Sequence, residues 1–307
     1  MGSISGFKNQ KRNTEKRKPV NERVQNWQEI YVPWTKEEAK IQASRCMDCG
    51  VPFCNNGCPL GNLIPEFNDL VYKEDWESAY LRLSATNNFP EFTGRICPAP
   101  CEASCTLSIN NDPVSIEMIE KNIIEKAWES GLVKPEPPKN RTGKKIAIIG
   151  SGPAGLAVAQ QLNRAGHEIT IYEKNEHPGG LLRFGIPEFK LEKAIVERRI
   201  NLLAEEGINF ECSVNAGIDI TANELMEKYD SICLAGGSTV PRDLPIKGRD
   251  LEGVHFAMDF LSEQNRWNEN PKDREITAKN KNVVIIGGGD TGADCLGTSI
   301  RQGAKSI

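Results

Sequence analysis

The 307-residue sequence lacks any apolar run of the length, about 18 residues, that a membrane-spanning helix requires. Its basic amino-terminal segment is not followed by the apolar stretch of a secretory signal. Positive charge is not in excess either, because 42 Asp and Glu outnumber 38 Lys and Arg. We therefore expect a cytoplasmic protein that binds neither membrane nor nucleic acid, and we interpret the locally basic residues 8–23 as a solvated arm.

Ten cysteines in a chain without an export signal are expected to stay reduced, which favours metal ligands or buried thiols over disulfides. Seven of them lie between Cys46 and Cys105. We interpret the other three, Cys212, Cys233 and Cys295, as buried small hydrophobic residues in apolar segments. The seven clustered cysteines are therefore the candidates for chemistry.

Hydrophobic periodicity changes at a stretch rich in proline and charge, which makes residues 136–144 the linker candidate. Residues 1–135 show helical periodicity, and Thr35 with Glu38 predicts a capped helix before the first cysteines. From Lys145, short apolar runs that end in glycine alternate with helical stretches, which predicts βαβ units around a mostly parallel sheet. The strand-to-glycine pattern of residues 145–155 recurs at 282–292.

The cysteines form two sets, Cys46-x2-Cys49-x4-Cys54-x3-Cys58-Pro and Cys97-x3-Cys101-x3-Cys105. The first set is similar to the bacterial ferredoxin run, in which the fourth cysteine ligates the other cluster, although one gap is longer here. By the same crossover, one 4Fe-4S cluster is assigned to Cys46, Cys49, Cys54 and Cys105. The second cluster is assigned to Cys58, Cys97 and Cys101.

Two such clusters need about eight protein ligands, one more than the seven cysteines supply. Glu120, on the predicted helix after the second set, is the candidate for the missing ligand, and a solvent-facing glutamate explains its position equally well. Structural zinc is the alternative for the whole set, but zinc sites usually use two matched pairs of ligands. The uneven spacing favours iron-sulfur clusters.

The segment KIAIIGSGPAGLAVAQQL predicts a strand, a tight turn and a helix in the order of a dinucleotide-binding fingerprint. Gly150 permits the turn, Gly152 lets the backbone approach a pyrophosphate, and Gly155 lets helix and strand pack closely. Glu173 ends the next predicted strand, where its carboxylate can accept hydrogen bonds from ribose hydroxyls. A nucleotide site is therefore predicted here.

Two further glycine loops follow. Gly179 and Gly180, with Leu181 and Arg183 after them, either form an ordinary turn or let the backbone pass close to a flavin. The segment VVIIGGGDTGADC repeats the fingerprint with glycines at 287, 289 and 292. Asp290 inside it is either a residue near phosphate or a helix cap. Two fingerprints suggest two dinucleotides, one a bound flavin and one an exchanging nicotinamide.

Six motifs together resemble the small (beta) subunit family of glutamate synthase: SRCMDCGVPFCNNGCPLGNLIPEFNDL, NNFPEFTGRICPAPCEASCTLSIN, PVSIEMIEK, GSGPAGLAVAQQL, GGLLRFGIPEFKL and GGGDTGADC. The resemblance runs from about Val20 to the last residue. Related arrangements occur in the amino-terminal part of dihydropyrimidine dehydrogenase and in other flavoprotein complexes.

The resemblance implies NADPH (or NADH) as donor, FAD as the two-electron acceptor, and two 4Fe-4S clusters that pass electrons to the large (alpha) subunit. That partner forms L-glutamate from glutamine and 2-oxoglutarate. The cofactors supply this chemistry, so no side chain is assigned a catalytic role. An electron-input subunit with a ferredoxin, pyrimidine or sulfur acceptor is the second interpretation, and a zinc-stabilised assembly module without activity is the third.

Residues are carried over from the family by position. FAD contacts would be Gly150, Ser151, Gly152, Pro153, Ala154, Gly155, Glu173, Lys174, Gly180, Leu181 and Lys190. Contacts to NADP would be Gly287, Gly288, Gly289, Asp290 and Thr291. The family pattern also supports the cluster crossover, and it places Glu120 where the dihydropyrimidine dehydrogenase relative uses a glutamine ligand.

The expected fold is α+β multidomain. An all-helical domain with two 4Fe-4S clusters spans residues 1–135, a Rossmann-like α/β FAD domain spans 145–255, and a second Rossmann-like NAD(P)-binding domain begins at 256–307. Compared with the family, the chain stops at Ile307, where the second strand of the nicotinamide domain is expected to start. The sequence is therefore interpreted as carboxyl-terminally truncated, and this chain alone is not expected to reduce an acceptor with NADPH.

Overall fold

The computed structural model describes residues 2–272 and 274–307, which form two compact units. Unit 1 ends at Lys134 and unit 2 begins at Pro135, except that Pro19–Glu29 belongs to unit 2. This short segment is held there because Arg301 donates hydrogen bonds to the backbone carbonyls of Arg23 and Asn26. The sequence-based boundary, which placed residues 1–135 together, differs from the structure in this segment.

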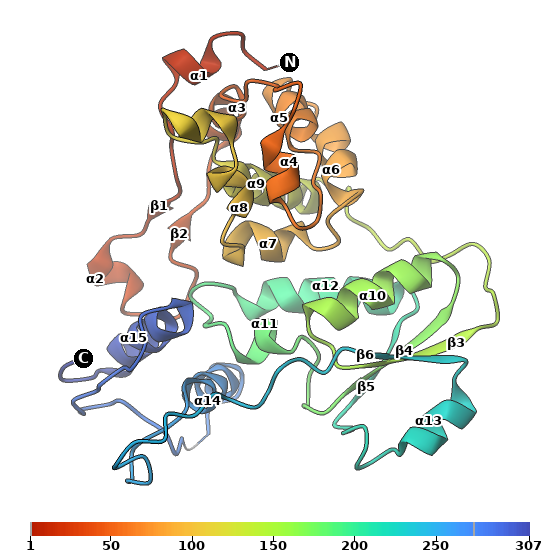
Figure 1. Ribbon diagram of the computed structural model, residues 1–307, viewed down its shortest axis with the longest axis vertical. Helices are drawn as coiled ribbons and strands as arrows, with labels where there is room; N and C mark the ends of the chain where they lie inside the picture. The colour runs from red at the N-terminus through yellow and green to blue at the C-terminus, as the bar shows by residue number, and fades with distance from the viewer. Residues whose placement is uncertain (1, 273) are drawn as a thin grey trace. The chain divides into compact units, whose positions relative to one another are not determined.

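Unit 1 consists mainly of short helices joined by loops (Figure 1). Its helices are α1 (Gly6–Asn9), α3 (Lys36–Ala43), α4 (Phe53–Gly57), α5 (Ile64–Tyr72), α6 (Trp76–Ser84), α7 (Pro90–Ile96), α8 (Pro100–Ala103), the 3-10 helix η1 (Thr106–Ile109) and α9 (Ile116–Glu129). Strands β1 (Lys16–Arg17) and β2 (Tyr31–Val32) pair antiparallel. The domain therefore contains a short sheet, whereas the sequence predicted helices alone.

The core of unit 1 lies among α3, α5, α6 and α9, where Phe67, Leu83, Ile119 and Ile123 are fully buried. Apolar residues recur along α9 at helical spacing, so one face of this helix points into the core. The predicted start of α3 is confirmed, because Thr35 and Glu38 form both hydrogen bonds of a capping box.

The expected solvated arm is only partly correct. Residues up to Lys18 belong to unit 1, and the buried Arg45 side chain donates a hydrogen bond to the Gln10 carbonyl. Ser115 donates to the Asn13 carbonyl in the same way. The segment therefore packs on the domain, because buried donors of the helical core use its backbone as their acceptor.

Unit 2 contains a four-stranded parallel sheet in the order β5-β4-β3-β6. The strands are β3 (Lys145–Ile149), β4 (Glu168–Glu173), β5 (Asn209–Cys212) and β6 (Ser231–Leu234). The helices are α2 (Val20–Arg23), α10 (Pro153–Arg164), α11 (Leu181–Phe184), α12 (Lys193–Glu205), α13 (Ala222–Lys228), α14 (Ala257–Glu269) and α15 (Asp290–Gln302).

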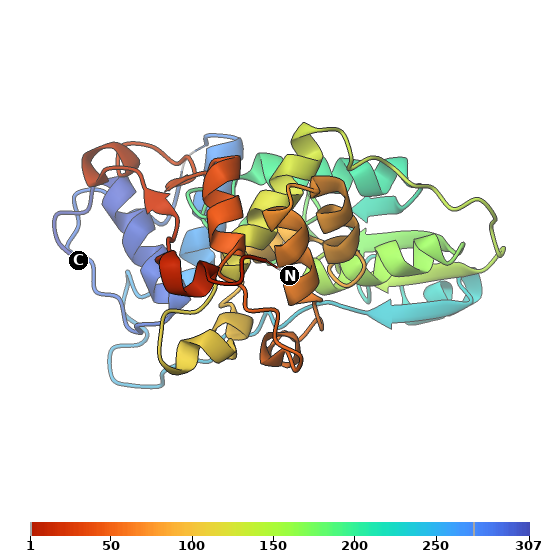
Figure 2. The same cartoon turned by 90° about the horizontal axis from the view of Figure 1, so that it is seen from above.

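Helices α10 and α12 lie over one face of this sheet and α13 lies across the other (Figure 1 and Figure 2). Alternate residues serve the two faces, and Ala147 and Tyr172 pack with Leu225 of α13. The strands confirm the short apolar runs predicted from Lys145 onward, and both faces of the sheet are covered, as is usual for a parallel sheet. The glycine loops at residues 150–155 and 179–180 follow the carboxyl ends of β3 and β4.

The strand expected from the repeated pattern at residues 282–292 differs. The run at residues 283–286 forms no named strand, and Asn282 makes only an isolated bridge with Ser306. Val284 and Ile286 are exposed, since no second strand of the described chain pairs with this run. Within the described residues, none of the helices has both the length and the apolar character needed to cross a bilayer.

The prediction for the three scattered cysteines holds only for Cys295, which is buried in α15. Cys212 and Cys233 are half-buried, because β5 and β6 are the outer strands of the sheet. Outer strands have fewer neighbours to cover their side chains.

Candidate functional site

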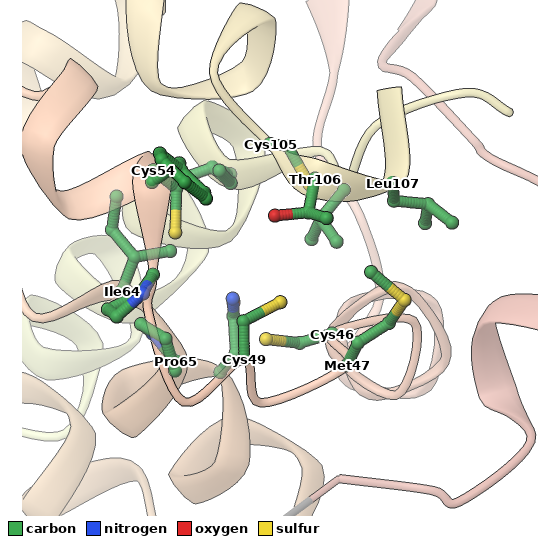
Figure 3. A pocket seen from close by; sticks show the side chains of 14 residues that line it. Cys46, Met47, Cys49, Cys54, Ile64, Pro65, Cys105, Thr106 and Leu107 are labelled. Atoms are coloured by element: carbon green, nitrogen blue, oxygen red, sulfur yellow. The ribbon is translucent and has the colours of Figure 1, made fainter. Parts of the chain in front are cut away.

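Four cysteines line one cavity in unit 1 (Figure 3). Cys46 follows α3, Cys49 lies in the next loop, Cys54 is on α4, and Cys105 precedes η1. Figure 3 shows these four side chains around a common space, with apolar residues such as Ile64 and Leu107 beside them. The crossover predicts this grouping, in which a distant cysteine from the second set joins three from the first.

Two thiols of this cavity are poorly solvated. Burial raises the pKa of Cys46 to about 11 and that of Cys54 to about 12, and the neighbouring thiols add to both increases. A metal that binds such a thiol displaces its proton, so these residues suit a site in which iron supplies the compensating positive charge. Among the described residues, no three or more His, Cys, Asp or Glu side chains are grouped as a single-ion site.

The remaining three cysteines and Glu120 form a second group. Cys58 ends α4, Cys97 ends α7, and Cys101 is buried in α8. Burial raises the pKa of Cys101, and the carboxylates of Glu120 and Glu102 contribute next, followed by Cys58 and Cys97. Helix α8 packs against α4 and α9, and α7 packs against α9, so the helices that carry or precede the residues assigned to the second cluster are neighbours.

Glu120 does not face solvent, so the solvent-exposed interpretation is wrong. It lies on the core-facing side of α9 with 5% of its surface exposed. Its carboxylate accepts hydrogen bonds from Asn62 (2.8 Å) and Thr93 (3.5 Å). Burial raises the pKa of Glu120 to about 7, although both hydrogen bonds lower it.

Sequence reasoning missed a second carboxylate in this group. Glu117 lies one turn before Glu120, and its charge is the largest electrostatic contribution to the raised pKa of Cys97 after burial itself. Burial, followed by Glu102 and Glu120, raises the pKa of Glu117 to about 8. The spacing of three residues along one helix was the available signal.

Helix α7 packs on α9 beside this group, and at Gly94 the backbones of the two helices come into direct contact. A Cβ atom on Gly94 would stand 2.8 Å from the Cα of Lys121 and 2.9 Å from its backbone nitrogen. Because the obstacle is backbone, the helices must separate to accommodate it. Gly94 therefore sets the distance between the segment that ends at Cys97 and the helix that carries Glu120.

We expect Gly94→Ala to lower the stability of unit 1 by about 1–3 kcal/mol and to weaken iron retention, because it forces α7 away from α9. Thermal unfolding and iron analysis of the purified chain measure both effects. Gly50→Ala is the matched control, since a Cβ there meets nothing within 4 Å. Equal stability of the two variants would contradict the proposed contact.

The first glycine loop of unit 2 has the shape that a phosphate site needs. Gly150 has a φ of +103°, and a Cβ on Gly155 would stand 2.0 Å from the Gly150 carbonyl oxygen. A Cβ on Gly152 would meet nothing within 4 Å. Gly152 caps α10, Pro153 follows at the first helical position, and no side chain caps this end, so its N–H groups remain available to an anion.

Glu173 is placed at this loop but already has protein partners. Its carboxylate accepts hydrogen bonds from the backbone and hydroxyl of Ser151 and from the backbone and amide of Asn175. Ser151 also accepts a hydrogen bond from the Gly179 backbone. The buried carboxylate therefore ties the two glycine loops together, and contact with a ribose would require one of these donors to give way.

The second glycine loop lies directly against the first. Gly180 has a φ of +53°, and a Cβ on it would stand 2.8 Å from the Cα of Gly152. Leu181 beside it is exposed. Lys174 is also exposed, whereas Lys190 forms an ion pair with Asp294 of α15. Of the predicted flavin contacts, the loop residues are thus gathered at one place, while Lys190 is engaged elsewhere.

The second fingerprint repeats the construction of the first. Gly287 has a φ of +121°, and a Cβ on Gly292 would stand 2.4 Å from the Gly287 carbonyl oxygen. Gly289 is the cap of α15, so the alternative that Asp290 caps the helix is wrong, and Asp290 is its first residue. Asp290 and Thr291 are exposed beside the open backbone of the glycines.

Comparison with known proteins covers both units. Residues 23–132 match the family model described as dihydropyrimidine dehydrogenase domain II, 4Fe-4S cluster. Residues 144–306, more than half of the chain, match the model of pyridine nucleotide-disulphide oxidoreductases. These matches confirm the predicted order of a helical iron-sulfur part and a dinucleotide-binding part.

Three relatives are similar along the whole chain. The glutamate synthase [NADPH] small chain of Mycobacterium tuberculosis (strain CDC 1551 / Oshkosh) is 56% identical over all of this chain and 64% of its own length. That of Bacillus subtilis is 53% identical, with 65% of its length covered. Glutamate synthase [NADH] of Schizosaccharomyces pombe is 53% identical, with 15% covered. The chain thus spans less than two thirds of the relatives it matches.

Proposed function

This chain belongs to the pyridine nucleotide-disulphide oxidoreductase family, and we propose that it is an electron-input part of a glutamate synthase. In this proposal it takes electrons from NADPH, or from NADH, and delivers them to a large subunit. That subunit would convert glutamine and 2-oxoglutarate to L-glutamate.

The observation that carries the proposal is similarity along the entire chain to proteins named glutamate synthase small chain. The similarity, at 53–56% identity, extends over all of the chain and so spans both the cysteine loops and the glycine loops. A relative named for NADH is equally similar to one named for NADPH, so both donors belong in the test. We infer a large partner subunit because these relatives are named small chains.

Two 4Fe-4S clusters would be held in unit 1. The first would take the cavity thiols Cys46, Cys49, Cys54 and Cys105. The second would take Cys58, Cys97, Cys101 and the Glu120 carboxylate. The first set offers four thiols from several loops, the ligation typical of such clusters, and the second offers three thiols and one carboxylate. Apolar residues lie around the first set, and a shell of this kind limits the access of solvent to a cluster.

Unit 2 would hold the two dinucleotides. Residues 145–255 would bind FAD, with its pyrophosphate in the open space beside Gly152 and at the start of α10. The nicotinamide nucleotide would lie on the glycines at 287–289, where a Cβ also meets nothing. When bound, FAD converts the two electrons of a hydride into single electrons, which the clusters carry. The chain's own share is to hold these groups in place.

A second acceptor has one observation in its favour. The family model that matches residues 23–132 is named for dihydropyrimidine dehydrogenase. A partner that reduces a pyrimidine therefore also fits the iron-sulfur part. Under this alternative the cofactors and their ligands are unchanged. Only the protein that receives the electrons differs.

We expect the chemically reduced, iron-loaded chain to be reoxidised by the large subunit of glutamate synthase when glutamine and 2-oxoglutarate are present. The visible absorbance of the clusters follows reoxidation under anaerobic conditions, and L-glutamate is measured as the product. Reduction by a chemical reagent makes the test independent of the nicotinamide site. NADPH and NADH are compared separately as reductants.

The outcomes separate the interpretations. Reoxidation by a ferredoxin or a pyrimidine-reducing enzyme, without response to the large subunit, overturns the proposed partner. A purified chain that contains zinc and no acid-labile sulfide overturns the electron-transfer role itself. Omission of 2-oxoglutarate is the control for product formation.

A further inference from the structure

A buried polar network surrounds Glu120 in unit 1. Asn62, with 1% of its surface exposed, donates a hydrogen bond from Nδ2 to the Glu120 Oε1 atom at 2.8 Å. Asn62 lies four residues after Cys58, in the loop that leads into α5. The hydrogen bond therefore joins the loop of one proposed cluster ligand to the side chain of another.

The direction of this hydrogen bond follows from the Glu120 carboxylate, whose oxygens can only accept when it is ionised. Thr86 donates from its hydroxyl to Asn62 Oδ1 at 2.7 Å. The amide oxygen of Asn62 is thus occupied by Thr86 while its amide nitrogen donates to Glu120. The two contacts together hold Asn62 in the orientation that presents a donor to Glu120.

Thr93 supplies the second hydrogen bond to Glu120, but it is the weaker one. Its single hydroxyl proton has two acceptors at 3.5 Å, Glu120 Oε2 and the Pro90 carbonyl. The Asn62 hydrogen bond is much shorter and has one acceptor. Of the two donors, Asn62 therefore has the greater control over where the Glu120 carboxylate lies.

Such an arrangement is what an iron-binding carboxylate requires. A ligand carboxylate needs one oxygen for the metal and a donor to hold the other, and outer partners of this kind set ligand orientation. Glu120 offers two oxygens, of which Oε1 has the short hydrogen bond and Oε2 has only the long one. Oε2 is therefore the oxygen that can leave its partner for a metal at least cost.

We propose that Asn62 is a positioning residue that orients the Glu120 carboxylate as a ligand of the second iron-sulfur cluster. This inference rests on the proposed function, because it requires that cluster. It adds a residue outside the cysteine spacing, since an asparagine in a turn after a cysteine is ordinarily interpreted as a loop residue.

The test compares Asn62→Leu with the unchanged chain, both purified anaerobically with their iron. Leucine has a similar volume and removes the donor. We expect iron of the second cluster to be lost to a chelator about 10- to 100-fold faster, with an altered paramagnetic resonance signal of that cluster and an unaltered signal of the first. Asn122→Leu is the matched control, because Asn122 lies on α9 with Glu120 and donates to the Met118 carbonyl within its own helix.

A double variant distinguishes loss of the hydrogen bond from a packing defect. In the double variant Asn62→Asp with Glu120→Gln, the hydrogen bond is restored with donor and acceptor exchanged. We expect it to recover most of the iron retention that Asn62→Leu loses. Recovery cannot come from a packing role alone, because the single Asn62→Asp variant has the same volume and places two carboxylates together.

Two results would overturn the inference. One is unchanged iron release in Asn62→Leu when Glu120→Ala loses the second cluster, and the other is failure of the double variant to exceed Asn62→Asp. If Glu120→Ala and Cys101→Ser both leave the iron content unchanged, the second cluster itself is absent. That outcome contradicts the proposed function and is thereby distinguished from failure of the Asn62 inference.

Discussion

Replacement of Cys105 by serine is expected to remove about half of the iron, from about eight atoms per chain to about four. The cavity in unit 1 is the reason, because Cys105 lines it together with Cys46, Cys49 and Cys54. Serine is a poor ligand for iron in such a site, and the cavity cannot supply another anionic side chain. Iron analysis and paramagnetic resonance of the reduced chain measure the loss.

The same experiment separates the crossover from assignment by sequence order. Under the crossover, Cys58→Ser removes the same resonance signal as Cys97→Ser, and Cys105→Ser removes the other one. If clusters followed sequence order, Cys58→Ser would instead resemble Cys54→Ser. Cys295→Ser is the control, because this thiol is buried in α15 and lies in unit 2.

Alanine at Gly152 is expected to leave unit 2 folded and to weaken FAD binding by at least about tenfold, equal to about 1.4 kcal/mol. A Cβ at this position meets no protein atom within 4 Å, and the φ of −66° suits alanine. The added methyl group would occupy the open space where the backbone must approach the pyrophosphate. Flavin fluorescence titration and thermal unfolding measure the two properties separately.

Alanine at Gly155, in contrast, is expected to lower the stability of unit 2. Its Cβ would stand 2.0 Å from the Gly150 carbonyl oxygen, so α10 must move and unit 2 loses about 1–3 kcal/mol of stability or more. Gly288→Ala is the control, since its Cβ is in open space in the other glycine loop. Unchanged FAD affinity in Gly152→Ala would falsify the placement of the pyrophosphate.

Much of the fold was predictable because local signals agreed with each other. The capping box at Thr35, the apolar runs of β3 and β4, and the glycine turn before α10 each specify a structure within a few residues. The grouping of Cys46, Cys49, Cys54 and Cys105 at one cavity was also predictable, since the cysteine spacing itself suggests the crossover. These features depend on neighbours in sequence.

What the sequence could not show depends on distant contacts. Nothing near Glu120 reveals that Asn62 and Thr93 are its partners, since they come from other segments. Likewise, the ion pair of Lys190 with Asp294 joins residues about a hundred positions apart. The apolar run at residues 283–286 illustrates the same limit, because apolar pattern alone does not create a strand without neighbouring strands to pair with.

Helix α4 has a consequence for how electrons move between the proposed clusters. Cys54 lies on this helix and Cys58 ends it, and the Cys58 backbone N–H donates to the Cys54 carbonyl at 3.1 Å. The crossover assigns these two residues to different clusters. Since one hydrogen-bonded turn of backbone links them, a hop from one centre to the other crosses a rigid, covalently fixed gap. The rate of that hop should therefore be insensitive to solvent viscosity, unlike a transfer that waits for domains to move.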